Sequence, residues 1–150
     1  CRKWGVDWQP ADTDYIYSDC ATWGPHPDVP EGLAVLAKEF PLVLLTNSMK
    51  DLIPHHIPRL GAPIHMAITA EETGAYKPHM QGFEYMLNKL GCGPEEILHV
   101  SSSLRYDLMT ADDLGITHKV FVNRGHEPGN PGYRYTEING INELPAVVGM

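Results

Sequence analysis

An α/β fold with a parallel, doubly wound sheet is the architecture that this sequence predicts, and two observations carry the prediction. Short apolar segments of strand length alternate with segments in which apolar residues recur at helical spacing. The connections between them are short, so right-handed crossovers would place helices on both faces of the sheet. The composition agrees, because 150 residues with 43% hydrophobic and 20% charged residues describe one ordinary globular domain.

The expected elements follow one another from about residue 29. Uninterrupted apolar runs predict four strands, at 41–45, 64–69, 97–100 and 119–122. Apolar residues on one face predict helices at 30–40, 50–60, 78–90 and 104–114, with a short closing helix at 138–148. Pro58 should end or kink the second helix, and Gly91 should cap the third. Residues 126–135 are rich in Gly and Pro and are expected to form a loop.

The first 26 residues carry an unusual set of aromatic side chains and no clear helical or strand period. All three tryptophans, Trp4, Trp8 and Trp23, lie there, with Tyr15 and Tyr17 between them. Such side chains need a surface to pack on. We expect a peripheral segment that covers the core, with a lid or pocket wall over a site as the alternative.

Charge and composition exclude several classes of protein. The net charge is -8, from 19 acidic residues against 11 Lys and Arg, which argues against nucleic acid as the main partner. The longest aliphatic run, Leu42 to Leu45, is far too short to cross a bilayer, so we expect no membrane partner. Three widely spaced cysteines (Cys1, Cys20 and Cys92) fit reduced thiols in a cytoplasmic protein.

Polar residues follow three of the predicted strands. The first strand runs into Thr46, Asn47 and Ser48, the second is followed by Lys77 just before a helix that Pro78 would begin, and the third ends in Ser101-Ser102-Ser103, with Asp107 on the next helical turn. Ligands bind at the carboxyl ends of parallel strands, so these side chains are expected to converge. Each has an ordinary interpretation as a helix cap, a solvated Lys or a dipole-stabilising Asp. Together they suit binding of a small carboxylate or phosphate and management of a proton.

These segments resemble a known family. Leu44 to Ser48, Tyr76-Lys77-Pro78, and His99 to Ser103 followed by Asp107 are similar to the second, third and fourth motifs of the haloacid dehalogenase superfamily of hydrolases, and residues 111–124 also resemble its core. The resemblance covers roughly residues 27–145, and its nearest branch is that of the type II 2-haloacid dehalogenases. It implies a three-layer, Rossmann-like fold with a parallel sheet.

The resemblance also implies a mechanism and a role for each residue. An Asp nucleophile would form a covalent ester with the substrate, and water would hydrolyse it. Thr46 and Asn47 would bind the anionic group of the substrate. Lys77 would keep the nucleophile ionised, Asp107 would orient Lys77 or the attacking water, and Ser102 would hydrogen-bond the nucleophile or the substrate carboxylate.

The opening motif of the family, a strand ending in the nucleophilic Asp, is not found. The nearest local match, 15–22 with Asp19, has a Thr three residues after the Asp instead of four, and no Gly between them. Residues 1–26 are therefore interpreted as the end of an inserted helical cap and the return segment, and 27–150 as a core domain without its first, central strand. Such a chain is expected to self-associate as a homo-oligomer or to need a missing N-terminal segment.

The fourth motif helps to distinguish the phosphatase branch of the superfamily from the dehalogenase branch. Phosphatases of the superfamily carry a magnesium-binding Asp where this chain has Ser102, and dehalogenases carry a Ser there. Dehalogenases also have an Asn at the position of Leu104 and a Tyr at the position of Phe83, so the haloacid substrate is not fully matched. We expect no metal or other cofactor. The eight His lack a ligand spacing, and His99, within a strand, is interpreted as a hydrogen-bonded core residue.

The leading interpretation is a metal-independent hydrolase acting through an aspartyl ester, with a small 2-haloacid as the anionic substrate. Two alternatives remain. One is a phosphatase of small phosphomonoesters, and the other is a catalytically inert fragment that binds an anion or a partner, since the 150-residue chain alone lacks the Asp nucleophile.

Overall fold

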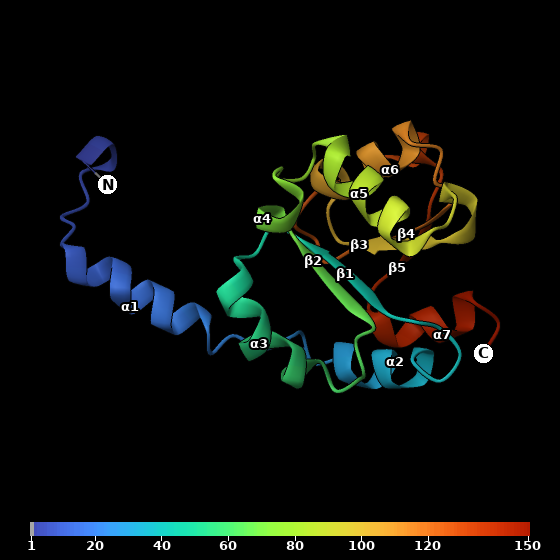
Figure 1. Ribbon diagram of the computed structural model, residues 1–150, viewed down its shortest axis with the longest axis horizontal. Helices are drawn as coiled ribbons and strands as arrows, with labels where there is room; N and C mark the ends of the chain where they lie inside the picture. Colours follow the sequence, from blue (N-terminus) through green and yellow to red (C-terminus); the bar gives the residue numbers. More distant parts are fainter. Residues whose placement is uncertain (1) are drawn as a thin grey trace.

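Five short parallel strands and seven α-helices form the chain in the computed structural model, which describes residues 2–150 and leaves Cys1 outside (Figure 1). The strands are β1 Val43–Thr46, β2 Met66–Thr69, β3 Leu98–Ser101, β4 His118–Val122 and β5 Thr136–Ile138. The α-helices are α1 Pro10–Cys20, α2 Val29–Leu36, α3 Ile53–His56, α4 Ala70–Thr73, α5 Met80–Leu90, α6 Met109–Asp113 and α7 Leu144–Val147. Shorter turns are η1 Arg2–Trp4, η2 Lys50–Leu52, η3 Ile57–Leu60, η4 Pro94–Glu96, the π-helical η5 Leu104–Leu108, η6 Pro131–Tyr133 and η7 Ile141–Glu143.

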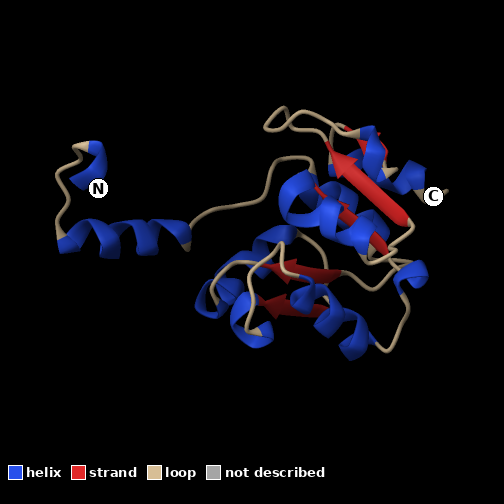
Figure 2. Ribbon diagram, turned by 90° about the horizontal axis from the view of Figure 1, so that it is seen from above, coloured by secondary structure: helices blue, strands red, loops and turns tan. Residues whose placement is uncertain are grey.

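The strands form two separate parallel sheets, which Figure 2 shows as two groups of arrows. In one sheet β1 pairs with β2, with Thr46 opposite Thr69. In the other, β4 lies between β3 and β5, with Val120 opposite both Val100 and Thr136. Among residues 2–150, β1 and β3 therefore each have one edge without a hydrogen-bonded strand. The single sheet that the sequence predicted is thus divided into two, and the lack of a central strand remains a prediction.

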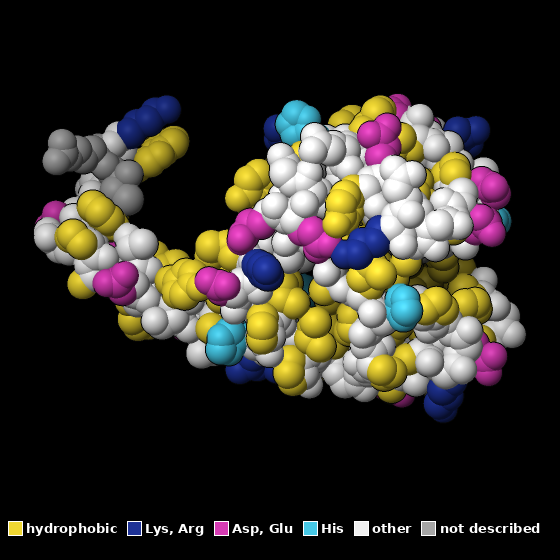
Figure 3. Space-filling view, viewed as in Figure 1, with side chains coloured by type: hydrophobic (Ala, Val, Ile, Leu, Met, Phe, Trp, Pro, Cys, Tyr) yellow, Lys and Arg dark blue, Asp and Glu magenta, His cyan; other side chains and the backbone are white. Residues whose placement is uncertain are grey.

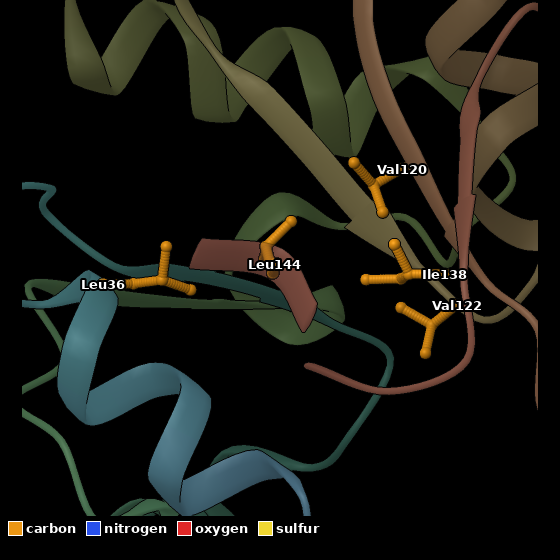
Figure 4. Packing of buried hydrophobic residues seen from close by; sticks show 5 residues of the cluster. All are labelled: Leu36, Val120, Val122, Ile138 and Leu144. Carbon is orange, nitrogen blue, oxygen red and sulfur yellow. The ribbon is translucent and has the colours of Figure 1, made fainter. Parts of the chain in front are cut away.

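The side chains of β4 point alternately to the two faces of its sheet, and helical segments cover both faces. Val120 and Val122 pack with Leu36 of α2 and Leu144 of α7, and Figure 4 shows these side chains converging with Ile138. Phe121 between them points to the other face, against Leu104 and Leu108. Because successive strand residues point to opposite faces, β4 is buried on both. The predicted three-layer α/β fold is confirmed.

The first 26 residues differ from the expectation. Pro10–Cys20 forms an α-helix, begun by Pro10 and a capping box between Gln9 and Asp12, yet none of its residues is buried. Figures 1 and 2 show α1 projecting away from the body of the molecule, and Figure 3 shows hydrophobic side chains along it. Trp4 is 78% exposed and Tyr15 72%. The expectation that these aromatic residues cover the core is therefore wrong within the described residues.

Four further expectations need correction. The closing helix predicted for 138–148 is interrupted, because β5 ends at Ile138 and is followed by η7 and α7. The helix predicted for 50–60 is three consecutive short turns, and α3 ends at His56, as expected from Pro58. Pro78 precedes α5 and is not its first residue. Met80 is exposed, so Phe83 and Met86 form the buried face of that helix instead.

Two smaller findings concern the membrane and the thiols. Among residues 2–150, no helix has the length and apolar character needed to cross a bilayer. Cys20 and Cys92 are free thiols.

An ion pair links α2, β4 and η7. Asp28 precedes α2 and accepts two hydrogen bonds from Arg124, at 3.0 and 2.8 Å, and one from the backbone N–H of Ile141 at 2.7 Å. The hydrogen bond with Arg124 outweighs burial and, with the Ile141 N–H, holds the pKa of the Asp28 carboxyl well below its usual range. The pair therefore joins the first helix of the body to the end of β4.

We expect Asp28→Asn to lower the free energy of unfolding by about 1–2 kcal/mol at neutral pH, because a bidentate charge-assisted pair becomes a neutral contact. Because the pKa of Asp28 is lower in the folded than in the unfolded protein, its carboxylate stabilises the fold at pH values above its unfolded pKa of about 3.9. This contribution is lost as the pH falls through that value toward the folded pKa. Urea unfolding at several pH values checks this. The deficit of the variant should shrink below about pH 4, whereas the exposed control Asp113→Asn should show no deficit at any pH.

Candidate active site

The backbone of Lys77 is held by the side chain of Asn47. The Lys77 N–H donates to Asn47 Oδ1 at 2.7 Å, and Asn47 Nδ2 donates to the Lys77 carbonyl at 3.1 Å. Asn47 directly follows β1, and Lys77 lies in the loop between α4 and α5. This reciprocal pair fixes the loop against the end of β1. The predicted contact of Asn47 with an anion remains a prediction, and it would use the second N–H of Nδ2, because only one of the two donates to Lys77.

The side chain of Lys77 reaches Asp107, as the order of motifs predicted. Lys77 Nζ lies 2.8 Å from Asp107 Oδ1, and the two side chains are only 16% and 6% exposed. Asp107 lies on the π-helical turn that follows β3. His99, in the second position of β3, contacts the same oxygen through Nε2 at 3.0 Å. Residues from three separate segments thus meet at one carboxylate oxygen.

Two opposing effects act on the pKa of Asp107. Burial is the largest and raises the pKa, because it penalises the charged form. The hydrogen bond from His99 and the positive charge of Lys77 together outweigh it, so the pKa lies below its ordinary value. Asp107 is therefore a carboxylate at neutral pH, and Lys77 faces it as a cation.

Thr46 and Ser102 lie at or just after the ends of β1 and β3. Thr46 is the last residue of β1, and its Oγ1 accepts a hydrogen bond from the Ser48 N–H at 3.0 Å. That bond uses the oxygen and leaves the hydroxyl proton able to donate to an anion. Ser102 follows β3 directly and is exposed. The structure thus links Asn47, Lys77 and Asp107 by direct contacts, whereas Thr46 and Ser102 lie at the ends of β1 and β3.

Two supporting residues were not anticipated. Glu127 lies in the stretch after β4 that was expected to be plain loop, and it accepts a hydrogen bond from Ser103 Oγ at 2.7 Å and from the Leu104 N–H at 3.2 Å. Thr110 Oγ1 donates to the Pro78 carbonyl at 2.7 Å. All three bonds join residues that are 23 or more positions apart in the chain, so no local pattern could have indicated them.

This arrangement suits a reaction of an anion. A partly buried cation held by a fixed carboxylate can stabilise negative charge that develops beside it, because its geometry does not have to reorganise during the reaction. The hydroxyl of Thr46, at the end of β1, can supply a neutral donor.

Comparison with known proteins agrees with these features. The family model described as haloacid dehalogenase-like hydrolase matches residues 5–115. The chain belongs to this family. The matched range includes the segments that carry Thr46, Lys77 and Asp107.

Curated relatives within the family have different activities. A glyceraldehyde 3-phosphate phosphatase of Methanocaldococcus jannaschii is 33% identical over 82 residues, which are 54% of this chain and 36% of the relative. An (S)-2-haloacid dehalogenase of Burkholderia cepacia is 25% identical over 126 residues, 79% of this chain and 53% of the relative. The matched region therefore spans between about a third and a half of the length of these proteins.

The fold is also that of solved dehalogenases. The L-2-haloacid dehalogenase of Xanthobacter autotrophicus, with chloropropionic acid covalently bound, is similar with a TM-score of 0.80 at 20% identity. The similarity covers 99% of this chain and 71% of that structure. At this identity the likeness establishes the haloacid dehalogenase-like fold alone.

Proposed function

We propose that this haloacid dehalogenase-like protein takes part in hydrolysis of a small 2-haloacid through a covalent aspartyl ester, without a metal. The observation that carries the proposal is the buried pair of Lys77 and Asp107, in which Lys77 is held by its backbone and by its ammonium group. Lys77 would keep the nucleophilic carboxylate ionised. Thr46 would donate to the substrate carboxylate, and Ser102 would contact the nucleophile or that carboxylate.

The proposed reaction has two steps. A carboxylate oxygen of the nucleophile attacks C2 of the haloacid, a C–O bond forms, and the carbon–halogen bond breaks with release of halide. Water then attacks the ester carbonyl, and the bond between the carbonyl carbon and the alkoxide oxygen breaks. One proton of water passes to that oxygen and the other to solvent, so the nucleophilic carboxylate is restored and the alcohol oxygen of the 2-hydroxyacid comes from the nucleophile. Asp107 would orient Lys77 during both steps.

The nucleophile itself is not among the motifs described above. Asp19 does not fit this role, because it lies on the projecting helix α1 and accepts a hydrogen bond from Trp23 Nε1 at 3.0 Å. Within this proposal, the nucleophile belongs to a strand that pairs with the free edges of β1 and β3.

A phosphatase is the second candidate, favoured by the 33% identity to the phosphatase of Methanocaldococcus jannaschii. The resemblance implies a magnesium ion for that branch. The described residues at this edge do not fit one, because Asp107 Oδ1 is bonded to Lys77 and His99 and Ser102 is not a carboxylate. Nor do residues 2–150 contain any group of three or more His, Cys, Asp or Glu that could hold a metal.

A halide assay separates these candidates. The protein, with any further segment that it carries in its natural source, is incubated with 2-chloropropionate and, separately, with glyceraldehyde 3-phosphate, each with and without a chelator. We expect chloride release that the chelator leaves unchanged. In ¹⁸O-labelled water, the product of a single turnover should carry unlabelled oxygen from the nucleophile. Phosphate release that the chelator abolishes would instead establish the phosphatase, and no release of either ion would favour a binding role.

A further inference from the structure

His99 contributes to the site although it belongs to none of the positions assigned a catalytic role above. It lies within β3, is 9% exposed, and its ring packs against that of Phe83 on α5 with centroids 5.2 Å apart. Packing alone would be satisfied by an apolar ring. The 3.0 Å contact between His99 Nε2 and Asp107 Oδ1 shows that the imidazole also makes a directed polar contact.

The direction of this hydrogen bond follows from chemistry. An ionised carboxylate only accepts hydrogen bonds, so Nε2 of His99 must carry the proton and donate it. Lys77 Nζ donates to the same oxygen at 2.8 Å. Asp107 therefore has two donors on Oδ1, one from β3 and one from the loop before α5, and together they define where that oxygen lies.

The charged groups around His99 leave Asp107 as its partner. Lys119, opposite His99 in the register of β3 and β4, is buried, but its Nζ is bonded to Asp112 and to the Ile116 carbonyl. Lys77 is bonded to Asp107 itself. The contact with His99 thus acts on a carboxylate that burial alone would drive toward its neutral form.

We propose that His99 is a positioning residue of this active site, which fixes the Asp107 carboxylate so that the carboxylate in turn directs Lys77. The inference rests on the function proposed above for Lys77 and Asp107. It adds a residue that acts through Asp107 and does not touch the substrate. A merely structural His99 would matter for stability and leave the state of Asp107 unchanged.

The first test needs no variant. A long-range ¹H–¹⁵N spectrum of the ¹⁵N-labelled protein reports which ring nitrogen of His99 carries the proton at neutral pH. We expect a protonated Nε2. A ring with Nδ1 protonated and Nε2 bare would overturn the proposal, because it could not donate to Asp107.

The second test compares His99→Phe, which keeps a ring beside Phe83 and removes the donor, with His99→Gln, whose amide nitrogen can replace Nε2. The ¹³C signal of the Asp107 carboxyl is followed against pH. We expect its pKa to rise by about one unit in the Phe variant and to stay near the wild-type value in the Gln variant. Equal titration in all three proteins, or the same rise in both variants, would overturn the proposal. His118→Phe, at an exposed position of β4, is the matched control.

Turnover supplies the third readout. The Phe variant should lower kcat by about 10- to 100-fold with little change in KM, because a misplaced Lys77 weakens the reaction more than binding. Its activity should also be lost at a higher pH than that of the wild type, because a raised pKa protonates Asp107 sooner as pH falls. If wild-type protein releases neither halide nor phosphate, the proposed function fails, and the Asp107 titration still decides the role of His99.

Discussion

Replacing Lys77 with Met is expected to reduce turnover by about 1,000-fold or more, because the change removes the lysine cation bonded to Asp107 while keeping the length of the side chain. Release of halide or phosphate from whichever substrate the wild type hydrolyses is the measurement. Asn47 holds the backbone of Lys77 and not its ammonium group, so the loop should keep its position in the variant. The lost activity would then be due to the missing charge.

The same variant should be less stable at neutral pH, by about 2–4 kcal/mol, because Asp107 would remain buried and, among residues 2–150, would keep only His99 as a hydrogen-bond donor. The pKa of Asp107 should rise, because burial would be opposed by His99 alone. As pH falls through this raised pKa, Asp107 takes up a proton and the instability relative to wild type should diminish.

Lys50→Met is the control for this experiment. Lys50 is an exposed residue of η2, and its replacement removes the same charge from the protein. It should leave turnover and stability nearly unchanged. Wild-type turnover in the Lys77 variant would contradict the role assigned to Lys77.

The second large effect is expected at Gly32, where Gly32→Ala should destabilise the protein by about 3 kcal/mol. Gly32 is buried in α2, and a Cβ there would lie 2.6 Å from the carbonyl carbon of Ile141 and 2.8 Å from its Cγ2. Helix propensity alone would favour Ala by about 1 kcal/mol. The overlap is with backbone, and the Ile141 N–H is bonded to Asp28, so η7 cannot easily move away. We expect the steric effect to be the larger.

Gly82→Ala is the matched comparison. Gly82 is also buried in a helix, α5, but a Cβ there would meet Thr73 Oγ1 at 3.8 Å and Leu45 Cδ1 at 3.9 Å, which are ordinary contacts. Here propensity should dominate and stability should rise by up to about 1 kcal/mol. Thermal unfolding of the two variants measures both changes. A shift of the same sign in both would show that the approach of α2 to η7 is not close enough to decide the outcome.

Sequence pattern was sufficient where a residue's environment is set by its near neighbours. The apolar runs of β1 to β4 predicted strands, and the Gly at position 91 predicted a left-handed cap, which it forms with φ of 68° after α5. The parallel order then predicted that Lys77 and Asp107 would meet at one edge, and they do. This succeeded because the carboxyl ends of parallel strands lie on one side of a sheet whatever their exact register.

Local pattern failed where a segment has few buried residues of its own. β5 is three residues long and only Ile138 of it is buried, so its strand character comes from pairing with β4. Helix α1 has no buried residue, so its sequence has no buried apolar face from which a helix could be predicted. In both segments the hydrophobic periodicity from which an element is predicted is lacking.

The sequence by itself determined the fold class, the order of most strands and helices, and the segments that carry Thr46, Lys77, Ser102 and Asp107. Only the tertiary structure decided what each polar group contacts: Asn47 holds the backbone of Lys77, His99 donates to Asp107, and Glu127 accepts from Ser103. These partners are separated by 30, 8 and 24 positions. The physical reason is that a hydrogen bond needs two atoms about 3 Å apart in the right direction, and for such partners only the packing of whole elements sets that distance.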